Sequence, residues 1–264
     1  SSRTRNGFAT VDMQELMRHD TMNKAARYEA TTLNPAEWHA LQTMSLYTLT
    51  GKHYSVFEDV PYMRIQAKDH KTPMKWRPVC SHFKRGAREA ETHLLKILTL
   101  IQAALPRSHV ISSTFAAHQQ VPKNAMHAQS HDIEGMFDAI VIDEAYASIS
   151  EFINQAFDAH PHKIISTARR VATWSKPTRT NNAHEHHTRE QTLGLLKHIL
   201  YEDYVIAGTT IFHSTAGVGM GMQCSSIISC LCCLSIEIHL LPLARQHYAN
   251  FFYVRYCDDV LCSL

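Results

Sequence analysis

The sequence predicts an α+β fold, in which antiparallel strands are backed by helices. Aromatic and β-branched residues flank an acidic dipeptide between Phe251 and Leu264, which is typical of a β-hairpin. Apolar residues recur at helical spacing between Glu89 and Leu105. The chain has 264 residues, of which 45% are hydrophobic, so it can bury a substantial core as one large domain or two small ones.

The first 60 residues are predicted to be a helical lead-in. Met13, Leu16 and Met17 indicate one amphipathic helix, and a second is expected from Pro35 to Leu49. Asn34 precedes that proline and is the expected N-cap of the second helix. No chemistry follows from either helix.

Two strands joined by a basic loop are predicted between Pro61 and Ser81. Apolar and polar residues alternate from Tyr62 to Ala67, and the extended pattern resumes at Arg77. Lysine supplies a point charge and arginine a planar fork, so such a hairpin can fold over a triphosphate. A solvated hairpin with a basic tip is the alternative. Cationic residues gather in and after the hairpin: Lys68, Lys71, Lys75, Arg77, Lys84, Arg85 and Arg88.

A core helix is predicted from Glu89 to Leu105. Pro106 ends the helix, and we assign it packing but no chemistry. The residues that share one face are Leu94, Ile97, Leu98, Ile101 and Leu105.

Three carboxylates lie within seven residues at Asp132, Glu134 and Asp138. On a strand they would share one face and Phe137 would point to the other, unless a turn after Gly135 breaks that register. The residues just before Asp132 are less apolar than a buried strand requires. A core aromatic is the alternative for Phe137.

A helix over 148–157 is followed by a polar segment rich in histidine, which we predict to be a solvated loop around 160–187. The run His184–His187 contains zinc-ligand types, but no cysteine pair or second histidine pair stands at a matching distance. Thr188–Gln191 then has the pattern of a capping box, so a helix is expected to begin there.

Closely spaced glycines from Gly217 to Gly221 precede a long apolar segment that ends at Glu237. Such glycines let the backbone approach a base pair or a template, and Ser225 follows in the first turns of the predicted helix. The apolar run Ile227–Ile236 is shorter than the roughly 20 residues of a membrane helix, so no membrane partner is expected. The segment also holds four of the seven cysteines, which are expected to be small buried residues of a reducing, intracellular compartment.

The C-terminal hairpin places Asp258 and Asp259 side by side at its turn. Adjacent like charges among core-type residues repel each other, and a divalent cation offsets that cost. An ordinary Asp-Asp turn is the alternative, because aspartate favours turns through its own local hydrogen bonds.

The order and spacing of these features resemble the reverse transcriptases of Penelope-like elements and telomerase. The resemblance implies a right-hand polymerase with fingers over 61–123, a palm over 124–264 and no thumb in this chain. Lys-x-His-Lys and Met-Gly favour the Penelope-like group, whereas Gly135 and Asp138 favour telomerase. Gly219 departs from the usual proline of the family. The resemblance rests on Lys-x-His-Lys at 68–71, Arg-Pro-Val at 77–79, Asp132 with Phe137, the segment 217–237, and Tyr-Cys-Asp-Asp at 256–259.

The resemblance implies an RNA-directed DNA polymerase that extends a DNA or RNA primer with dNTPs on an RNA template. Asp132 and Asp258, with the carbonyl of Ile133, would hold two Mg²⁺ ions about 4 Å apart, and Mn²⁺ is a possible substitute. Asp259 would complete the catalytic acids. Phe137 would fill the space of a 2′-hydroxyl and so select deoxynucleotides. Substrate contacts are implied for Lys68 or Lys71, Arg77, Phe137, Gly221 and Ser225.

Two other functions stay open. An RNA-dependent RNA polymerase shares the palm and the double aspartate, but usually has glycine where Cys257 stands and a second acid where Phe137 stands. A degenerate, non-catalytic nucleic-acid-binding element is the other, although all three carboxylates are present. The formal net charge of +2 does not by itself indicate a nucleic-acid partner. The resemblance further implies a nuclear location in a eukaryote, and the oligomeric state is left open.

Overall fold

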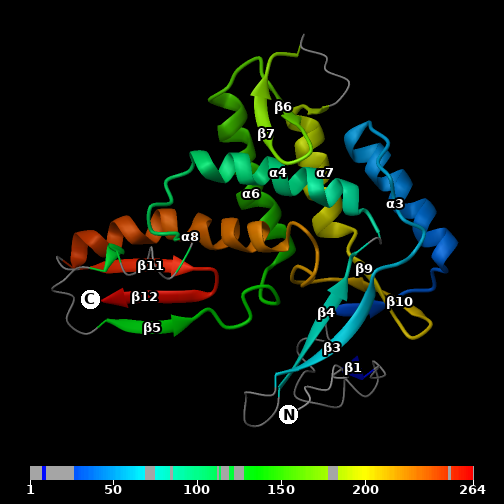
Figure 1. The fold of residues 1–264 in the computed structure, drawn as a ribbon, viewed down its shortest axis with the longest axis horizontal. Helices are drawn as coiled ribbons and strands as arrows, with labels where there is room; N and C mark the ends of the chain where they lie inside the picture. The colour runs from blue at the N-terminus through cyan, green and yellow to red at the C-terminus, as the bar shows by residue number, and fades with distance from the viewer. Residues whose placement is uncertain are drawn as a thin grey trace.

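The computed structural model is a mixed α and β structure, which confirms the predicted fold class (Figure 1). The structure describes residues 8–9, 27–68, 75–83, 86–111, 113, 119–121, 128–177, 184–248 and 251–263. The helix predicted at Met13, Leu16 and Met17 and the loop lysine Lys71 lie outside these residues.

The largest sheet contains the predicted basic hairpin. The two strands of the hairpin are antiparallel, with Tyr62 opposite Ser81 and Lys68 opposite Lys75. The sheet also includes strands from the lead-in and from the predicted palm, so the lead-in is not purely helical and the sheet crosses the predicted boundaries. Its order is β1-β3-β9-β10-β2, with β4 beside β3: β1 (Phe8–Ala9), β2 (Tyr28–Ala30), β3 (Tyr62–Lys68), β4 (Lys75–Ser81), β9 (Tyr204–Ala207) and β10 (Thr210–Ser214).

Helices form the centre of the molecule (Figure 1). Both predicted N-caps are confirmed: Asn34 accepts hydrogen bonds from the amides of Ala36 and Glu37, and Thr188 accepts one from the amide of Gln191. The predicted apolar face of the helix after the hairpin is fully buried from Leu94 to Ile101 and lies in the main core. The helices are α3 (Pro35–Thr50), α4 (Arg88–Ala104), α6 (Ile142–Asp158), α7 (Arg189–Tyr201) and α8 (Ser225–His247).

The helix α8 is longer and more apolar than the run Ile227–Ile236 suggested. Its length and its mean hydropathy of 2.0 would by themselves suffice to cross a membrane, a criterion that a core helix of a soluble protein also meets. Here Ile228, Leu231 and Leu234 are buried in the main core, and α8 contacts α4 and α6. Packing within the domain therefore accounts for the apolar character of its inner face.

A smaller antiparallel sheet carries the predicted C-terminal hairpin. Its order is β11-β12-β5, with β5 (Gln129–Asp132), β11 (Phe252–Tyr256) and β12 (Asp259–Ser263). All four residues of β5 are exposed and this strand lies at the sheet edge, which explains the polar sequence before Asp132. Helix α8 runs alongside β11 (Figure 1).

The segment predicted to be a solvated loop around 160–187 instead contains a third antiparallel sheet, so that prediction was wrong. The order is β7-β6-β8, with β6 (Ile164–Thr167), β7 (Ala172–Ser175) and β8 (Glu185–His187). The sheet forms because Ile165 and Thr167 are buried and the His187 ring is hydrogen-bonded to Thr167 at 3.1 Å. Among the described residues, no group of three His, Cys, Asp or Glu side chains is arranged to hold a metal ion.

Candidate active site

Backbone pairing brings the three predicted catalytic carboxylates to one end of the small sheet. Asp259, at the start of β12, lies directly opposite Asp132 at the end of β5. Asp258 occupies the turn between β11 and β12, and its carbonyl accepts a hydrogen bond of 2.8 Å from the amide of Ile133. The tip of the hairpin and the end of β5 therefore form one unit.

Within the part of the chain that the structure describes, the charges at this end of the sheet have no ion-pair partner. Asp132, Asp258 and Asp259 are all exposed, and no described cation forms an ion pair with any of them. Like charges directly opposite each other on neighbouring strands are destabilising. Carboxylate and carbonyl oxygens are the donors that Mg²⁺ prefers, so these residues fit a hard divalent cation.

The register differs in one respect from the predicted ligand set. Asp259 is the direct neighbour of Asp132 across the strands, whereas Asp258 lies in the turn. The assignment of Asp132, Ile133 and Asp258 as metal ligands, with Asp259 as an electrostatic partner, stays a prediction.

A buried charged network contacts strand β11 of the C-terminal hairpin. Arg255 is fully buried in β11, and its Nη2 donates to Oε2 of Glu237 at 2.9 Å. The same carboxylate accepts hydrogen bonds from the Tyr253 hydroxyl at 2.7 Å and shares one with Nε2 of His109 at 2.9 Å. We call these four residues the Arg255 network.

The Arg255 network also reaches the turn that carries Asp258. The Nη1 of Arg255 donates to the carbonyl of Cys257 at 2.9 Å. Cys257 has a φ of 53°, a left-handed conformation that is unusual for a residue other than glycine. The guanidinium therefore stabilises a turn conformation that the sequence alone disfavours.

The Arg255 network carries a full ion pair at neutral pH. Burial would raise the pKa of Glu237, but hydrogen bonds from His109, Arg255 and Tyr253 outweigh it and lower the pKa to about 2. Burial opposes the charge of Arg255 as well, yet the contact with Glu237 raises its pKa above the usual value. In the sequence, this network is marked by a single arginine, Arg255, in an apolar strand and by a single glutamate, Glu237, in an apolar helix.

The acidic segment after β5 does not continue as a strand. Residues 134–139 form turns, and Gly135 has a φ of 66°, so Asp132, Glu134 and Asp138 do not share one strand face. Asp138 instead turns inward and pairs with Arg27 at 2.9 Å, and both side chains are buried. Arg27 was not identified from the sequence.

Phe137 lies against the glycine turn, by which we mean Gly217–Gly221. It is half-buried, and its carbonyl accepts a hydrogen bond of 2.9 Å from the amide of Val218. A Cβ atom on Gly217 would lie 2.9 Å from that carbonyl oxygen, so a glycine is needed for this approach. The structure thus brings together two segments that are 80 residues apart in the sequence.

The other end of the glycine turn packs against the basic hairpin. The amide of Cys80 in β4 donates to the carbonyl of Met220 at 2.7 Å. Gly221 has a φ of 123°, and a Cβ atom there would lie 1.8 Å from the carbonyl oxygen of Cys80. Ser225 is buried and donates to the carbonyl of Met222 at 3.0 Å. These contacts explain Gly221 and Ser225 by packing, and their contact with a substrate stays a prediction.

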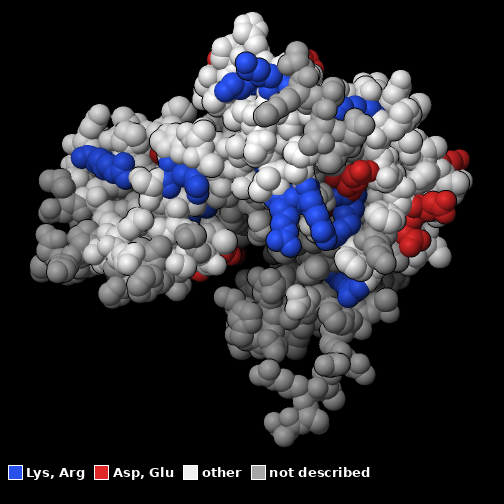
Figure 2. All heavy atoms as spheres, turned by 45° about the horizontal axis from the view of Figure 1, so that its top comes forward, with Lys and Arg blue, Asp and Glu red and all other residues white. Residues whose placement is uncertain are grey.

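Residues of the basic hairpin and of the glycine turn line a shared groove of about 370 Å³. Arg64 stacks over the Tyr62 ring at 4.4 Å, and Arg88 lies 5.2 Å from the centre of the exposed Phe83 ring. Lys and Arg side chains gather near the middle of the face in Figure 2. Residues lining the groove include Arg64, Gln66, Cys80, Phe83, Arg88 and Gly221.

Two of the predicted phosphate-binding residues lie on this hairpin. Lys68 is the last residue of β3 and lies opposite Lys75 in the strand register. Arg77 in β4 lies opposite Gln66. Their backbone positions agree with a basic hairpin, and their contact with a triphosphate stays a prediction.

Solved telomerase structures share the fold of this chain. No family model matches the sequence, and a search of curated proteins found no match. Telomerase of Candida tropicalis in the apo form matches with a TM-score of 0.57 and 9% identity, covering 90% of this chain and 46% of that one. Telomerase of Candida albicans in complex with a TWJ fragment of telomeric RNA matches with a TM-score of 0.55 and 13% identity, covering 94% and 47%.

The chain spans about half the length of these telomerase structures. A third match, apo C. tropicalis telomerase truncated from its C-terminal domain, has a TM-score of 0.52 and 11% identity, and covers 90% of this chain and 53% of that one. Such low identity shows the fold alone. The chain therefore has a telomerase-like reverse transcriptase fold, while its Penelope-like affinity and its fingers and palm boundaries stay predictions.

Proposed function

We propose that this chain is the polymerase region of an RNA-directed DNA polymerase, which extends a DNA or RNA primer with dNTPs by two-metal nucleotidyl transfer. The observation that carries the proposal is the pairing of Asp259 with Asp132 and of Ile133 with Asp258 at the end of the small sheet. The telomerase of C. albicans was solved with telomeric RNA, which supports RNA as the class of template.

In this proposal Asp132, Asp258 and the Ile133 carbonyl would hold two Mg²⁺ ions, and Mn²⁺ would be a substitute. When bound, such ions lower the pKa of the primer 3′-hydroxyl and neutralise charge on the phosphates. Asp259 adjusts the local electrostatic potential, because its carboxylate adds negative charge beside the ligands.

The remaining residues bind and orient the nucleotide and the template. Lys68 or Lys71, with Arg77, binds the triphosphate through charge-assisted hydrogen bonds. Phe137 excludes a 2′-hydroxyl by its bulk, and its contact with Val218 fixes its backbone beside the glycine turn. Gly221 and Ser225 shape the surface that receives the base pair.

A non-catalytic nucleic-acid-binding function is the second candidate. The specific observation in its favour is the groove lined by Arg64 and Arg88 beside the exposed ring of Phe83. The basic groove between the hairpin and the glycine turn would serve this function equally well.

Primer extension tests the proposal. We expect this chain, with Mg²⁺ and an RNA template annealed to a DNA primer, to incorporate dNTPs and not NTPs. Asp258→Asn and Asp132→Asn should each lower incorporation by about 10³-fold, because each would remove a charged carboxylate ligand of the metal ions. Glu144→Gln removes an exposed charge at the start of α6 and is the matched control.

Three results would change the proposal. Incorporation of NTPs would identify an RNA polymerase. A folded chain that binds the RNA–DNA duplex without incorporation would establish the binding function. Incorporation that survives both aspartate substitutions would show that the carboxylates at the hairpin are not catalytic.

A further inference from the structure

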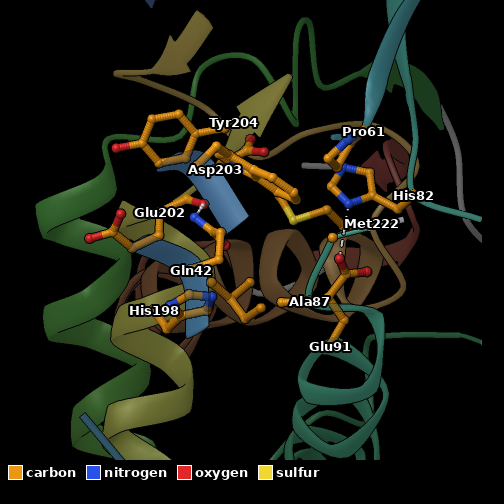
Figure 3. A pocket seen from close by; sticks show the side chains of 13 residues that line it. Gln42, Pro61, His82, Ala87, Glu91, His198, Glu202, Asp203, Tyr204 and Met222 are labelled. Atoms are coloured by element: carbon orange, nitrogen blue, oxygen red, sulfur yellow. Dashed lines mark hydrogen bonds and ion pairs between the residues drawn. The ribbon is translucent and has the colours of Figure 1, made fainter. Parts of the chain in front are cut away.

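A small polar cavity lies behind the glycine turn, where α3, α4, α7 and the segment before α8 meet (Figure 3). The centre of a water molecule can occupy about 20 Å³ of this cavity, which is enough space for one water. Polar side chains from different parts of the chain line the cavity: Gln42, His82, Glu91, Glu202 and Asp203.

Two of these side chains have buried polar atoms for which the described residues supply no hydrogen-bond partner. Asp203 is only 5% exposed, and among the residues that the structure describes neither of its carboxylate oxygens has a hydrogen-bond partner. The Nε2 of the buried His82 has no hydrogen-bond partner in the described part of the chain either. Buried polar groups in folded proteins are nearly always paired with protein or with ordered water. The unmet groups of Asp203 and His82 therefore indicate a water in this cavity.

Glu91 joins His82 to the segment that leads into α8. Its Oε1 lies 2.9 Å from Nδ1 of His82, and its Oε2 accepts a hydrogen bond of 2.9 Å from the amide of Gln223. Burial favours a neutral His82, but contacts with Cys80 and Glu91 outweigh it and raise the pKa to about 10. His82 and Glu91 are therefore a charged pair at neutral pH, and the dashed line in Figure 3 marks their contact.

Asp203 touches the glycine turn from the other side of the cavity. A Cβ atom on Gly219 would lie 3.1 Å from its Oδ2. Figure 3 shows Asp203 and His82 reaching the cavity from different sides, with Glu91 extending from α4 toward His82. His82 directly follows β4, whose Cys80 amide is bonded to Met220. The cavity is thus lined by Met222, which directly follows the glycine turn, and by His82 at the end of the basic hairpin.

We propose that a water molecule bound in this cavity joins Asp203 to His82, and that the chain Asp203–water–His82–Glu91 positions the glycine turn against β4. Asp203, His82 and Glu91 are positioning residues that act on nucleotide binding through the glycine turn, and not on the carboxylates of the small sheet. The kinetic consequence rests on the proposed polymerase function, whereas the positioning itself does not.

Hydrogen exchange on the 264-residue chain tests the positioning directly. The reporters are the amides of Cys80, Gly217 and Val218, which are bonded to Met220, Ile140 and Phe137. Asp203→Leu removes a buried carboxylate that has no hydrogen-bond partner among the described residues, so the melting temperature should change little, yet the three amides should exchange about tenfold faster. Asp203→Asn can still bind the water and should exchange within about twofold of the wild type.

The matched control is Ser229→Ala, because Ser229 is a buried polar residue in α8 whose hydroxyl also has no hydrogen-bond partner among the described residues. Unchanged exchange of the three amides in Asp203→Leu would overturn the proposal. If Asp203→Leu does not fold, Glu91→Gln is measured in the same way, and unchanged exchange there would overturn it equally.

Primer extension separates positioning from chemistry. Asp203→Leu should raise the KM for dNTPs about tenfold and leave kcat within about twofold, since only the binding surface is loosened. A fall in kcat with unchanged KM would contradict the positioning role. If the wild-type chain extends no primer, the polymerase function fails, and the exchange experiment still decides the positioning proposal.

Discussion

Two buried charged clusters support different parts of the proposed active site, and their polar groups find hydrogen-bond partners to different degrees. In the Arg255 network, both oxygens of Glu237 are used, by Arg255, Tyr253 and His109. In the cavity cluster of Asp203, His82 and Glu91, the Asp203 carboxylate has no hydrogen-bond partner among the described residues. One cluster is complete within the protein, and the other needs a water.

The difference matches what each cluster supports. A fully satisfied buried network is rigid and specifies one geometry, as the turn that carries Asp258 requires. The cavity cluster supports the contact between the glycine turn and the basic hairpin, the surfaces proposed to admit a nucleotide. A cluster completed by one water can loosen at lower cost, because the water can leave or rearrange.

Breaking the Arg255 network should have the largest effect on stability. Arg255→Met leaves Glu237 buried without its cation, and removal of one partner of a buried ion pair costs about 3–5 kcal/mol. Urea unfolding of Arg255→Met should show a loss in this range. Arg189→Met, which breaks the more exposed pair with Asp158, is the matched control and should cost below about 1 kcal/mol.

The double variant Arg255→Met with Glu237→Leu distinguishes charge from packing. It removes both charges and should regain most of the stability lost in Arg255→Met. If the double variant is as unstable as Arg255→Met, the network stabilises through shape and not through its charges. Equal losses in Arg255→Met and Arg189→Met would contradict the network altogether.

The next largest effect should come from the glycine turn on the side of the cavity cluster. Gly221→Ala places a Cβ atom 1.8 Å from the Cys80 carbonyl oxygen at a φ of 123°, so the backbone must shift. We expect a loss of about 3 kcal/mol in the free energy of unfolding, measured with urea.

Gly208→Ala is the control for Gly221→Ala. Gly208 has a φ of 63° with no atom within 4 Å of its Cβ position, so only the backbone strain of about 1 kcal/mol should appear. Similar losses at Gly208 and Gly221 would show that the close approach to Cys80 contributes nothing.

Local sequence patterns predicted those parts of the fold that depend on neighbouring residues. The caps at Asn34 and Thr188 and the buried face of α4 follow from spacings of three or four residues. The hairpin with Asp258 at its turn follows from β-forming residues on both sides of an acidic pair.

The buried clusters could not be predicted in this way, because their partners lie far apart in the sequence. Nothing near Asp138 identifies Arg27 as its partner, and nothing near His82 identifies Asp203. The strands between Ile164 and His187 were missed for a related reason. Histidine and threonine read as solvated residues until their hydrogen bonds inside the sheet are known.

The smallest expected effect is a pH dependence that distinguishes the two clusters. The pKa of His82 is about 10 in the folded protein and about 6.5 when unfolded. Below pH 6.5 both states carry the proton, so the stabilisation is fully present. Above it the folded state keeps a proton that the unfolded state has released, and stability falls by up to about 1.4 kcal/mol per pH unit.

The stability difference between the wild type and His82→Gln isolates this proton from the other titrating groups. We expect the difference to fall by about 2 kcal/mol between pH 7 and 8.5, as measured by urea unfolding at each pH. The Arg255 network should lose nothing over the same range, because the pKa of Glu237 is lowered to about 2 and its contribution is lost only in acid. A constant difference would mean that His82 is not held as the cation of the Glu91 pair. The cavity would then contain a neutral imidazole, and its contact with Glu91 would be an ordinary hydrogen bond.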